Sequence, residues 1–409
     1  MSEKRICVFV ESSCVGAAHT AEAARGLGYE PFFLTDPGFS QGDTKAQLQR
    51  YSHRRCQTSS VPALVAAAQE IGPTAALISF SDTCLMNASQ AARALRVRGL
   101  DEAVERLKDK WEVYQLVPEH SPPTIAFTAP EVPVEALQEM IARHGRVMVK
   151  GRRNSGGQGS VVLAAPADVR GLAALLEKTP IPAHLGPDLF MAQAFIEGSL
   201  VSLEGYVSEG RAHFLGFSGR HKIGMSESRI LFPWDDNVPP AARERAYQAL
   251  HDVVARAGLQ RGYFHVEFMI SGERAYIIDA NIGRVGGGGL GQQIALAHGV
   301  SPETVHAHAL ALALGDPTTA PAAYRSGPQR KTISIMYGMP VEAEYLSVKL
   351  PPNVPGYHTI ILDAPQRVPA MGTDNYAWIA IASGEDGPLQ RWLDEIVITA
   401  SEGTFSPVY

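Results

Sequence analysis

Short apolar runs alternate with amphipathic stretches over the first hundred residues of the chain. The pattern predicts strands at 6–10, 31–35 and 74–82, and helices at 16–28, 61–72 and 83–97. Strands that alternate with helices along a chain are typical of a parallel sheet covered by helices. The pattern therefore predicts a doubly wound, Rossmann-like N-terminal domain over residues 1–105.

A proline-rich stretch at 120–135 predicts a linker into a second unit. After it, a helical pattern precedes two apolar runs, at 146–150 and 160–165, which predict strands on either side of a glycine-rich loop. Another helix is predicted at 166–178. Together these elements predict a small α+β lid domain over residues 106–195.

Residues 196–409 favour an antiparallel sheet. Apolar runs separated by turn glycines predict successive strands, a helix is predicted at 241–259, and a hairpin follows at 262–280. The β-rich C-terminal segment ends in a helical pattern at 387–397. The expected fold class thus combines α/β and α+β parts: a parallel N-terminal sheet, a small lid and an antiparallel C-terminal domain.

Composition and charge limit the classes of function. The chain is 45% hydrophobic and 19% charged, as soluble globular proteins are, and its net charge of -6 argues against nucleic acid as a partner. Its cysteines form no CxxC pair, which argues against a structural zinc site and indicates a reducing compartment. No apolar stretch approaches the length of a membrane span. We therefore expect a cytoplasmic protein without a membrane or nucleic-acid partner.

Two carboxylates in the predicted hairpin suggest a metal site. Glu267 lies on the polar face of an alternating strand, and a three-residue turn centred on Glu273 would place Asp279 directly opposite. Two carboxylates at that distance repel unless a divalent cation lies between them, and Asn281 returns to the same face with a neutral oxygen. This oxygen-only set suits Mg²⁺.

A lysine and a glycine-rich loop suggest a phosphate site. Lys150 ends an apolar alternation, and the nine residues after it include four glycines. Free backbone amides beside one ammonium group suit a row of phosphate oxygens. With the carboxylates, these are the parts that phosphoryl transfer requires.

The order of these motifs resembles that of the ATP-grasp superfamily, and within it the L-amino acid ligases and related carboxylate-amine ligases. The resemblance covers most of the chain. It is carried by "KWEVYQLV" at 110–117, "VMVKGRRNSGGQGS" at 147–160, "MAQAFIEG" at 191–198, "FHVEF" at 264–268 and "IIDANIGR" at 277–284.

The resemblance implies site residues, position by position. The metal ligands it implies are Glu267, Asp279 and Asn281, and the catalytic residues are Arg284, Lys150 and His265. The nucleotide-binding residues it implies are Lys110, Lys150, Ser155, Gly156, Gly157, Gln193, Phe195, Ile196 and Glu204.

The resemblance also implies a reaction. ATP, held with one or two Mg²⁺ ions or with Mn²⁺ in their place, would phosphorylate a small-molecule carboxylate. A small-molecule amine would then attack the acyl phosphate and leave an amide or peptide bond, ADP and phosphate. The loop at 151–159 would close over the phosphates and exclude water. Homodimers occur among the proteins that this chain resembles.

Other functions remain open on the sequence. An ATP-grasp carboxylase or a phosphoribosyl-type ligase would share these motifs. A nucleotide-binding protein without turnover would account for Arg284 lying three residues after Asn281, where the family has two. A P-loop is disfavoured because the glycine loop lacks the required lysine. A dinucleotide-binding turn is disfavoured because Gly286 lies too far beyond Asp279.

Several side chains have both functional and structural interpretations. His265 shares a strand face with Glu267, so it either contacts substrate, orients the metal site or makes a structural hydrogen bond. Arg152 and Arg153 are either solvated or in contact with a phosphate or carboxylate. Two further histidines, His306 and His308, are two residues apart on a predicted helix and so face different directions, which argues against a shared metal.

Overall fold

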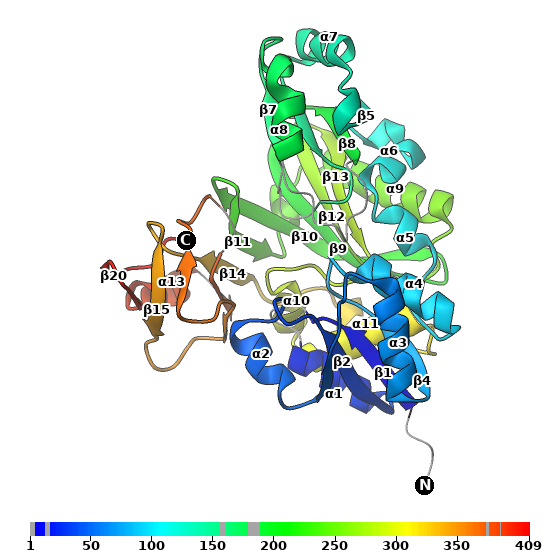
Figure 1. The fold of residues 1–409 in the computed structure, drawn as a ribbon, viewed down its shortest axis with the longest axis vertical. Coiled ribbons are helices and arrows are strands. Elements are labelled where there is room, and N and C mark those ends of the chain that lie inside the picture. Colours follow the sequence, from blue (N-terminus) through cyan, green and yellow to red (C-terminus); the bar gives the residue numbers. More distant parts are fainter. Residues whose placement is uncertain (1–4, 13–16, 155–159, 179–188, 374–375, 385) are drawn as a thin grey trace.

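The computed structural model describes residues 5–12, 17–154, 160–178, 189–373, 376–384 and 386–409. Their strands form four sheets. The molecule is elongated, with the N-terminal sheet near one end and a small sheet carrying α7 and α8 at the other (Figure 1). A third, larger sheet lies between them, and the C-terminal sheet projects to one side.

The N-terminal sheet has the predicted parallel αβ architecture. Its strands pair in the order β3-β2-β1-β4, and all the pairings are parallel. The strands are β1 (Arg5–Val10), β2 (Tyr29–Thr35), β3 (Ser52–Arg55) and β4 (Thr74–Ile78), and the helices are α1 (Ala17–Gly26), α2 (Gly42–Leu48), α3 (Val61–Ile71) and α4 (Leu85–Leu95). Because the strands are parallel, the residues that follow β1 and β4 meet at one edge of the sheet.

The lid sheet is antiparallel, in the order β5-β8-β6-β7. Its elements are β5 (Thr124–Thr128), α7 (Val134–His144), β6 (Val147–Gly151), β7 (Val161–Leu163), α8 (Leu172–Lys178) and β8 (Leu189–Ala194). Strand β5 lies inside the predicted linker, so that prediction was wrong. The prolines flank the strand rather than interrupt it, and β5 is an edge strand.

The large sheet has eight strands in the order β13-β12-β9-β10-β11-β14-β18-β16. They are β9 (Ser199–Ser208), β10 (Arg211–Ile223), β11 (Ser226–Phe232), β12 (Gly262–Ser271), β13 (Arg274–Ile282), β14 (Thr332–Tyr337), β16 (Tyr357–Ile360) and β18 (Trp378–Ser383). Every pairing in it is antiparallel. The antiparallel C-terminal domain predicted from the turn glycines therefore has this sheet as its centre.

A small C-terminal sheet, in the order β17-β15-β19-β20, completes the fold. Its strands are β15 (Ala343–Lys349), β17 (Gln366–Val368), β19 (Val397–Ala400) and β20 (Gly403–Phe405), and helix α13 (Asp386–Asp394) precedes β19. Trp378 and Leu393 lie in one buried cluster that joins this sheet to β14 and β18.

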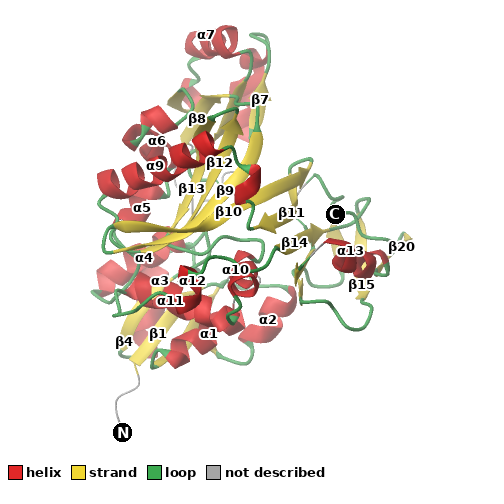
Figure 2. Ribbon diagram, turned by 180° about the vertical axis from the view of Figure 1, so that it is seen from behind, coloured by secondary structure: helices red, strands yellow, loops and turns green. Residues whose placement is uncertain are grey.

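Helices cover both faces of the large sheet. Helices α5 (Ala103–Leu107), α6 (Lys110–Leu116) and α9 (Pro240–Ala257) pack against β13. In both views α10 (Leu290–His298) and α11 (Pro302–Leu314) lie between the large sheet and the N-terminal sheet (Figure 2), and α11 packs on α1. The short helix α12 (Ala322–Arg325) follows. This layering brings the end of the N-terminal sheet against the glycine-rich segment that precedes α10.

Helix α11 has clear start and stop signals and a buried interior. The Ser301 side chain accepts a hydrogen bond from the Thr304 amide at 3.3 Å, and Gly315 ends the helix in the left-handed conformation. The helix carries two buried histidines, and burial lowers the pKa of both His306 and His308 to about 4.

These histidines predict an acid-sensitive fold. Below an unfolded pKa of about 6.5 and down to the folded pKa of about 4, the unfolded chain binds more protons than the native one. We therefore expect the free energy of unfolding to fall as pH is lowered through this window, by up to about 1.4 kcal/mol per histidine per pH unit, and the thermal unfolding midpoint to fall with it. Thermal unfolding at several pH values measures the slope. His308→Gln, which can still meet the Tyr263 hydroxyl, should reduce it, whereas the exposed control His53→Gln should not. Equal slopes in wild type and His308→Gln would contradict the prediction.

Candidate nucleotide and metal site

Strands β12 and β13 bring the predicted metal ligands together. Glu267 pairs with Asp279, and His265 pairs with Asn281, in the register expected from the sequence. Opposed residues of an antiparallel pair have Cβ atoms roughly 4.5–5.5 Å apart. Two carboxylates therefore face each other across this hairpin.

The register arises differently from the prediction. Ser271 pairs with Arg274, so the turn has two residues rather than the expected three. An irregularity after Glu267 then inserts Ile278 as an extra residue in β13, which restores the pairing with Asp279. The two deviations cancel.

The bulge also creates an acceptor for the predicted phosphate lysine. The Ile278 carbonyl oxygen accepts hydrogen bonds from Lys150 Nζ and from the Tyr114 hydroxyl, both at 2.9 Å. Lys150 Nζ also lies 3.4 Å from the Tyr114 oxygen. The lysine of the lid strand β6 is thereby positioned beside the carboxylate hairpin.

Lys110 joins the same group from α6. Its Nζ lies 3.1 Å from Asp279 Oδ1 and donates to the Asn154 carbonyl at 2.7 Å. The Asp109 side chain caps α6 by accepting a hydrogen bond from the Trp111 amide, and this cap fixes the backbone of Lys110. Three segments far apart in the sequence thus converge on one point.

Arg220, from β10, faces Glu267 on the other side. Its Nη1 lies 3.3 Å from Glu267 Oε1 and 2.6 Å from His265 Nε2, and its Nη2 is paired with Glu227. His265 Nδ1 lies 2.9 Å from both carboxylate oxygens of Glu204. A chain of charged and polar groups therefore runs from Glu204 to the metal-ligand candidate Glu267.

Burial and charge shift the pKa values of these groups. Burial, reinforced by the Lys110 cation, lowers the pKa of Lys150 to about 7. Burial alone would raise the pKa of Glu267, but Arg220 and His265 hold it well below its usual value. Burial likewise opposes the charged form of His265, but the Glu204 carboxylate raises the pKa of that imidazole. The site thus keeps Glu267 ionised and leaves Lys150 easily discharged when no anion is bound.

A cavity of ≈ 820 Å³, open to solvent, lies between the lid sheet and this hairpin. Seven of the predicted residues line it: Lys110, Lys150, Gln193, Phe195, Ile196, Glu267 and Asp279. The wall also includes residues that were not predicted, namely Met148, Asn154, Lys222, Met225, Met269 and Ile278.

Other predicted residues lie elsewhere. Glu204 does not line this cavity: its carboxylate is buried and accepts from Ser202 and Ser218 while it faces His265, so direct nucleotide contact is not what the structure shows. His265 itself is buried behind Glu267. The predicted loop residues Ser155, Gly156 and Gly157 lie outside the described residues.

Arg284 is held at the edge of the N-terminal sheet. Its Nη2 donates to Asn281 Oδ1 at 2.9 Å and lies 3.2 Å from Asp82 Oδ1, while Lys108 Nζ donates to Asp82 Oδ2 at 2.5 Å. Burial alone would raise the pKa of Asp82, but these two cations hold it well below its usual value. Asp82 therefore fixes Arg284 beside the metal-ligand candidate Asn281.

Replacing Asp82 is expected to weaken the fold. Asp82→Asn leaves two largely buried cations without their shared anion, which should lower the free energy of unfolding by about 3 kcal/mol. Chemical denaturation measures the loss. The same substitution at the exposed Asp236 serves as control, and adding Lys108→Met to Asp82→Asn should recover part of the stability. An unchanged unfolding midpoint in Asp82→Asn would contradict this account.

Arg152 and Arg153 turn away from the cavity. Both guanidinium groups bind the buried Asp109 carboxylate, and Arg152 does so through two contacts at 2.9 and 2.8 Å. Of the two interpretations, a solvated loop surface or contact with a phosphate or carboxylate, the structure supports the second, and the carboxylate belongs to the protein itself. These arginines attach the start of the glycine loop to α6.

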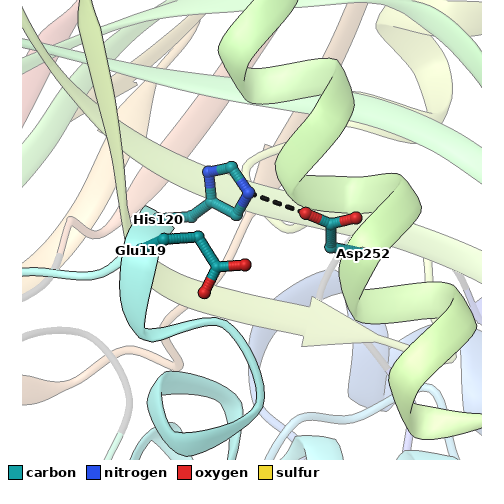
Figure 3. Close-up of side chains that lie close together, drawn as sticks. All are labelled: Glu119, His120 and Asp252. Carbon is teal, nitrogen blue, oxygen red and sulfur yellow. Dashed lines mark hydrogen bonds and ion pairs between the residues drawn. The ribbon is translucent and has the colours of Figure 1, made fainter.

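Three further potential metal ligands, Glu119, His120 and Asp252, lie close together away from this cavity. Figure 3 shows His120, from the 3-10 turn Pro118–His120, bonded to Asp252 of α9 with Glu119 beside them. Their ligand atoms lie within 4.8 Å of one another. However, the Arg256 guanidinium already pairs with Glu119 and lies 3.7 Å from Asp252. The charge of these carboxylates is therefore already offset by a cation of the protein.

Four functional candidates escaped the sequence analysis: Asp82, Lys108, Tyr114 and Arg220. Tyr114 lies one helical turn after Lys110, so the i, i+4 spacing was an available signal. Asp82 follows a buried strand at the carboxyl edge of a parallel sheet, which is a second usable signal. Nothing in the sequence near Lys108 or Arg220 indicates their partners.

Residues 107–288 match the family model of the ATP-grasp domain. No curated protein sequence matches the chain significantly.

Solved structures align along nearly the whole chain. L-amino acid ligase from Bacillus licheniformis superposes with a TM-score of 0.75 at 14% identity, covering 98% of this chain and 100% of that one. Phosphoribosylglycinamide synthetase from Anaerococcus prevotii gives 0.68 at 15% identity, with 98% and 100% covered. The biotin carboxylase domain of the Hydrogenobacter thermophilus 2-oxoglutarate carboxylase gives 0.73 at 13%, with 97% and 91% covered. The chain therefore has the ATP-grasp fold.

Among the described residues, no helix has both the length and the apolar composition needed to cross a membrane.

Proposed function

We propose that this protein is an ADP-forming, ATP-dependent ligase that joins a carboxylate to an amine. The observation that carries the proposal is the meeting of Lys110, Lys150 and the Glu267–Asp279 pair at one cavity. Two cations and two facing carboxylates are the groups that positioning and charge neutralisation in phosphoryl transfer require.

In this proposal the nucleotide lies in the cavity between the lid sheet and the carboxylate hairpin. Lys150 and Lys110 would contact the phosphates, while Gln193, Phe195 and Ile196 line the part of the wall formed by β8 and the residues after it. The lid, which we assign to residues 106–195, would cover the nucleotide, and the part from 196 to 409 would supply the carboxylates. The N-terminal part, 1–105, contributes Asp82 and through it the position of Arg284.

The donor chemistry fits a hard divalent cation. Glu267, Asp279 and Asn281 offer only oxygen atoms, and Glu267 is kept ionised by its neighbours. These three residues would hold Mg²⁺, or Mn²⁺ in its place, which when bound would neutralise charge on the phosphate oxygens.

The proposed reaction needs no protein nucleophile. A substrate carboxylate oxygen attacks the γ-phosphorus of ATP, the bond to the β-γ bridging oxygen breaks, and ADP leaves. The amine nitrogen then attacks the acyl carbon, inorganic phosphate leaves, and the amine proton passes to solvent. Lys150 and Lys110 offset the phosphate charge, and Arg284, fixed by Asp82 and Asn281, would offset charge on the acyl oxygens.

Hydroxylamine tests this proposal without knowledge of the natural amine. Purified protein with ATP, Mg²⁺ and each of a set of amino acids and small acids should form a hydroxamate with at least one acid, in step with ADP. ADP formation that depends on bicarbonate alone would indicate a carboxylase. Nucleotide binding without ADP formation from any acid would favour a protein that binds nucleotide but does not turn it over.

A further inference from the structure

A second, smaller cavity lies beyond Arg284 from the hairpin, between the N-terminal sheet and helices α10 and α11. Arg284 and the glycine run 286–288 line it, together with Thr20 of α1 and His306 of α11. Phe80, Val285 and Ala309 make much of the remaining lining apolar. Because Arg284 also bonds to Asn281, this cavity adjoins the proposed site of phosphoryl transfer.

One buried polar atom that lines this cavity has no partner. The His306 side chain is only 8% exposed, and its Nε2 has no hydrogen-bond partner among the residues that the structure describes. The other ring nitrogen, Nδ1, lies 3.5 Å from the Thr20 hydroxyl. Buried polar atoms in native proteins are nearly always hydrogen-bonded, so an unpartnered nitrogen in a cavity wall points to a ligand.

The chain keeps space open in front of this nitrogen. Gly291 lies in α10, and a Cβ at this position would be 3.3 Å from His306 Nε2. A larger side chain at this position, in the first turn of α10, would therefore crowd the imidazole. Burial keeps the His306 imidazole uncharged near neutral pH, with a pKa of about 4. An uncharged imidazole suits a neutral donor or acceptor on the ligand better than a charged group.

We propose that this cavity holds the body of the carboxylate substrate, and that this substrate is a small acid with a mainly apolar chain and one uncharged hydrogen-bonding group that meets His306 Nε2. The inference rests on the proposed ligase function, since it assigns the acid whose carboxylate would lie beside Arg284. His306 is then a specificity-determining residue rather than one that acts on the reacting atoms.

Pairs of nearly isosteric acids test the assignment. Hydroxamate formation is measured for threonine and valine, asparagine and leucine, and tyrosine and phenylalanine, with hydroxylamine as the common acceptor. In at least one pair, wild type should have the higher kcat/KM for the polar member. His306→Leu should reduce that preference by about tenfold, because it removes the hydrogen-bonding group while keeping an apolar wall. His306→Gln, which restores an amide there, should recover part of it.

Two further variants separate specificity from folding. His308→Leu removes a buried histidine from the same helix but outside the cavity, so any loss of activity should be equal for both members of a pair. Gly291→Ala places a methyl group 3.3 Å from His306 Nε2. It should lower kcat/KM for the polar member of a pair more than for the apolar member, with little change in the thermal unfolding midpoint.

The outcomes are distinct. A preference that His306→Leu and Gly291→Ala leave unchanged, while hydroxamate still forms, would overturn the assignment of this cavity and leave the ligase function standing. A wild-type preference for the apolar member in every pair would do the same. Absence of hydroxamate with every acid tested would overturn the ligase proposal and this inference with it.

Discussion

Glu267→Gln is expected to lower turnover by about 100-fold or more while leaving nucleotide binding largely intact. Glutamine has nearly the same shape, but it removes the negative charge that faces Asp279 and Arg220. Loss of one preorganised electrostatic group in an active site typically costs this much in kcat. ADP formation measures turnover, and calorimetry measures the dissociation constant of the nucleotide.

The same hairpin offers a matched control. Glu273→Gln changes an exposed carboxylate in the turn, six residues from Glu267, and should retain normal turnover. A dependence of the residual activity of Glu267→Gln on higher Mg²⁺ concentration would agree with the role as a metal ligand. Normal turnover in Glu267→Gln would remove Glu267 from the metal site.

Lys150→Ala is expected to weaken ATP binding by about 10- to 100-fold, the range for loss of one hydrogen bond to a charged group. The effect should depend on pH. Because the pKa of Lys150 is lowered to about 7 when no anion is bound, a phosphate must draw a proton onto it, and binding should weaken as pH rises from 6 to 8. Calorimetry in two buffers of different ionisation enthalpy would detect the proton uptake.

The phosphates of the nucleotide also exchange protons near neutral pH, and comparison of variants corrects for this background. Wild type and Lys150→Ala share that background, so only wild type should show the additional proton uptake near pH 7. Lys349→Ala, an exposed lysine on the C-terminal sheet, controls for a general change of charge. Identical proton uptake in wild type and Lys150→Ala would show that Lys150 does not contact the phosphates.

The hairpin shows how far local pattern carries an inference. The alternation around Glu267 predicted which residues share a face, because side chains of a strand alternate with a period of two. The turn length was predicted wrongly, since a bulge at Ile278 compensates for the shorter turn. Bulges are not visible in an alternation of only a few residues, yet this one supplies the carbonyl that receives Lys150.

The role of Glu204 could not be predicted from local pattern. Its place in the resemblance suggested a nucleotide contact, but β9 pairs Glu204 with His265 across the sheet, and the carboxylate orients that imidazole instead. Pairing between β9 and β12 joins residues about sixty positions apart, so nothing near Glu204 in the sequence could indicate it. The same holds for Arg220 and two of its partners, His265 and Glu267, which lie on β12 more than forty positions away.

By itself, the sequence determined the alternation of strands and helices in the N-terminal part, the facing carboxylates of the hairpin, and the lysine with its glycine loop. These features depend on periodicity and on residues within one or two turns of each other. Only the tertiary structure decided that Asp82 holds Arg284, that Lys110 meets Asp279, and that His306 lines a cavity with Thr20. Those contacts join segments up to 286 positions apart, and their geometry is set by how sheets and helices pack rather than by any local preference.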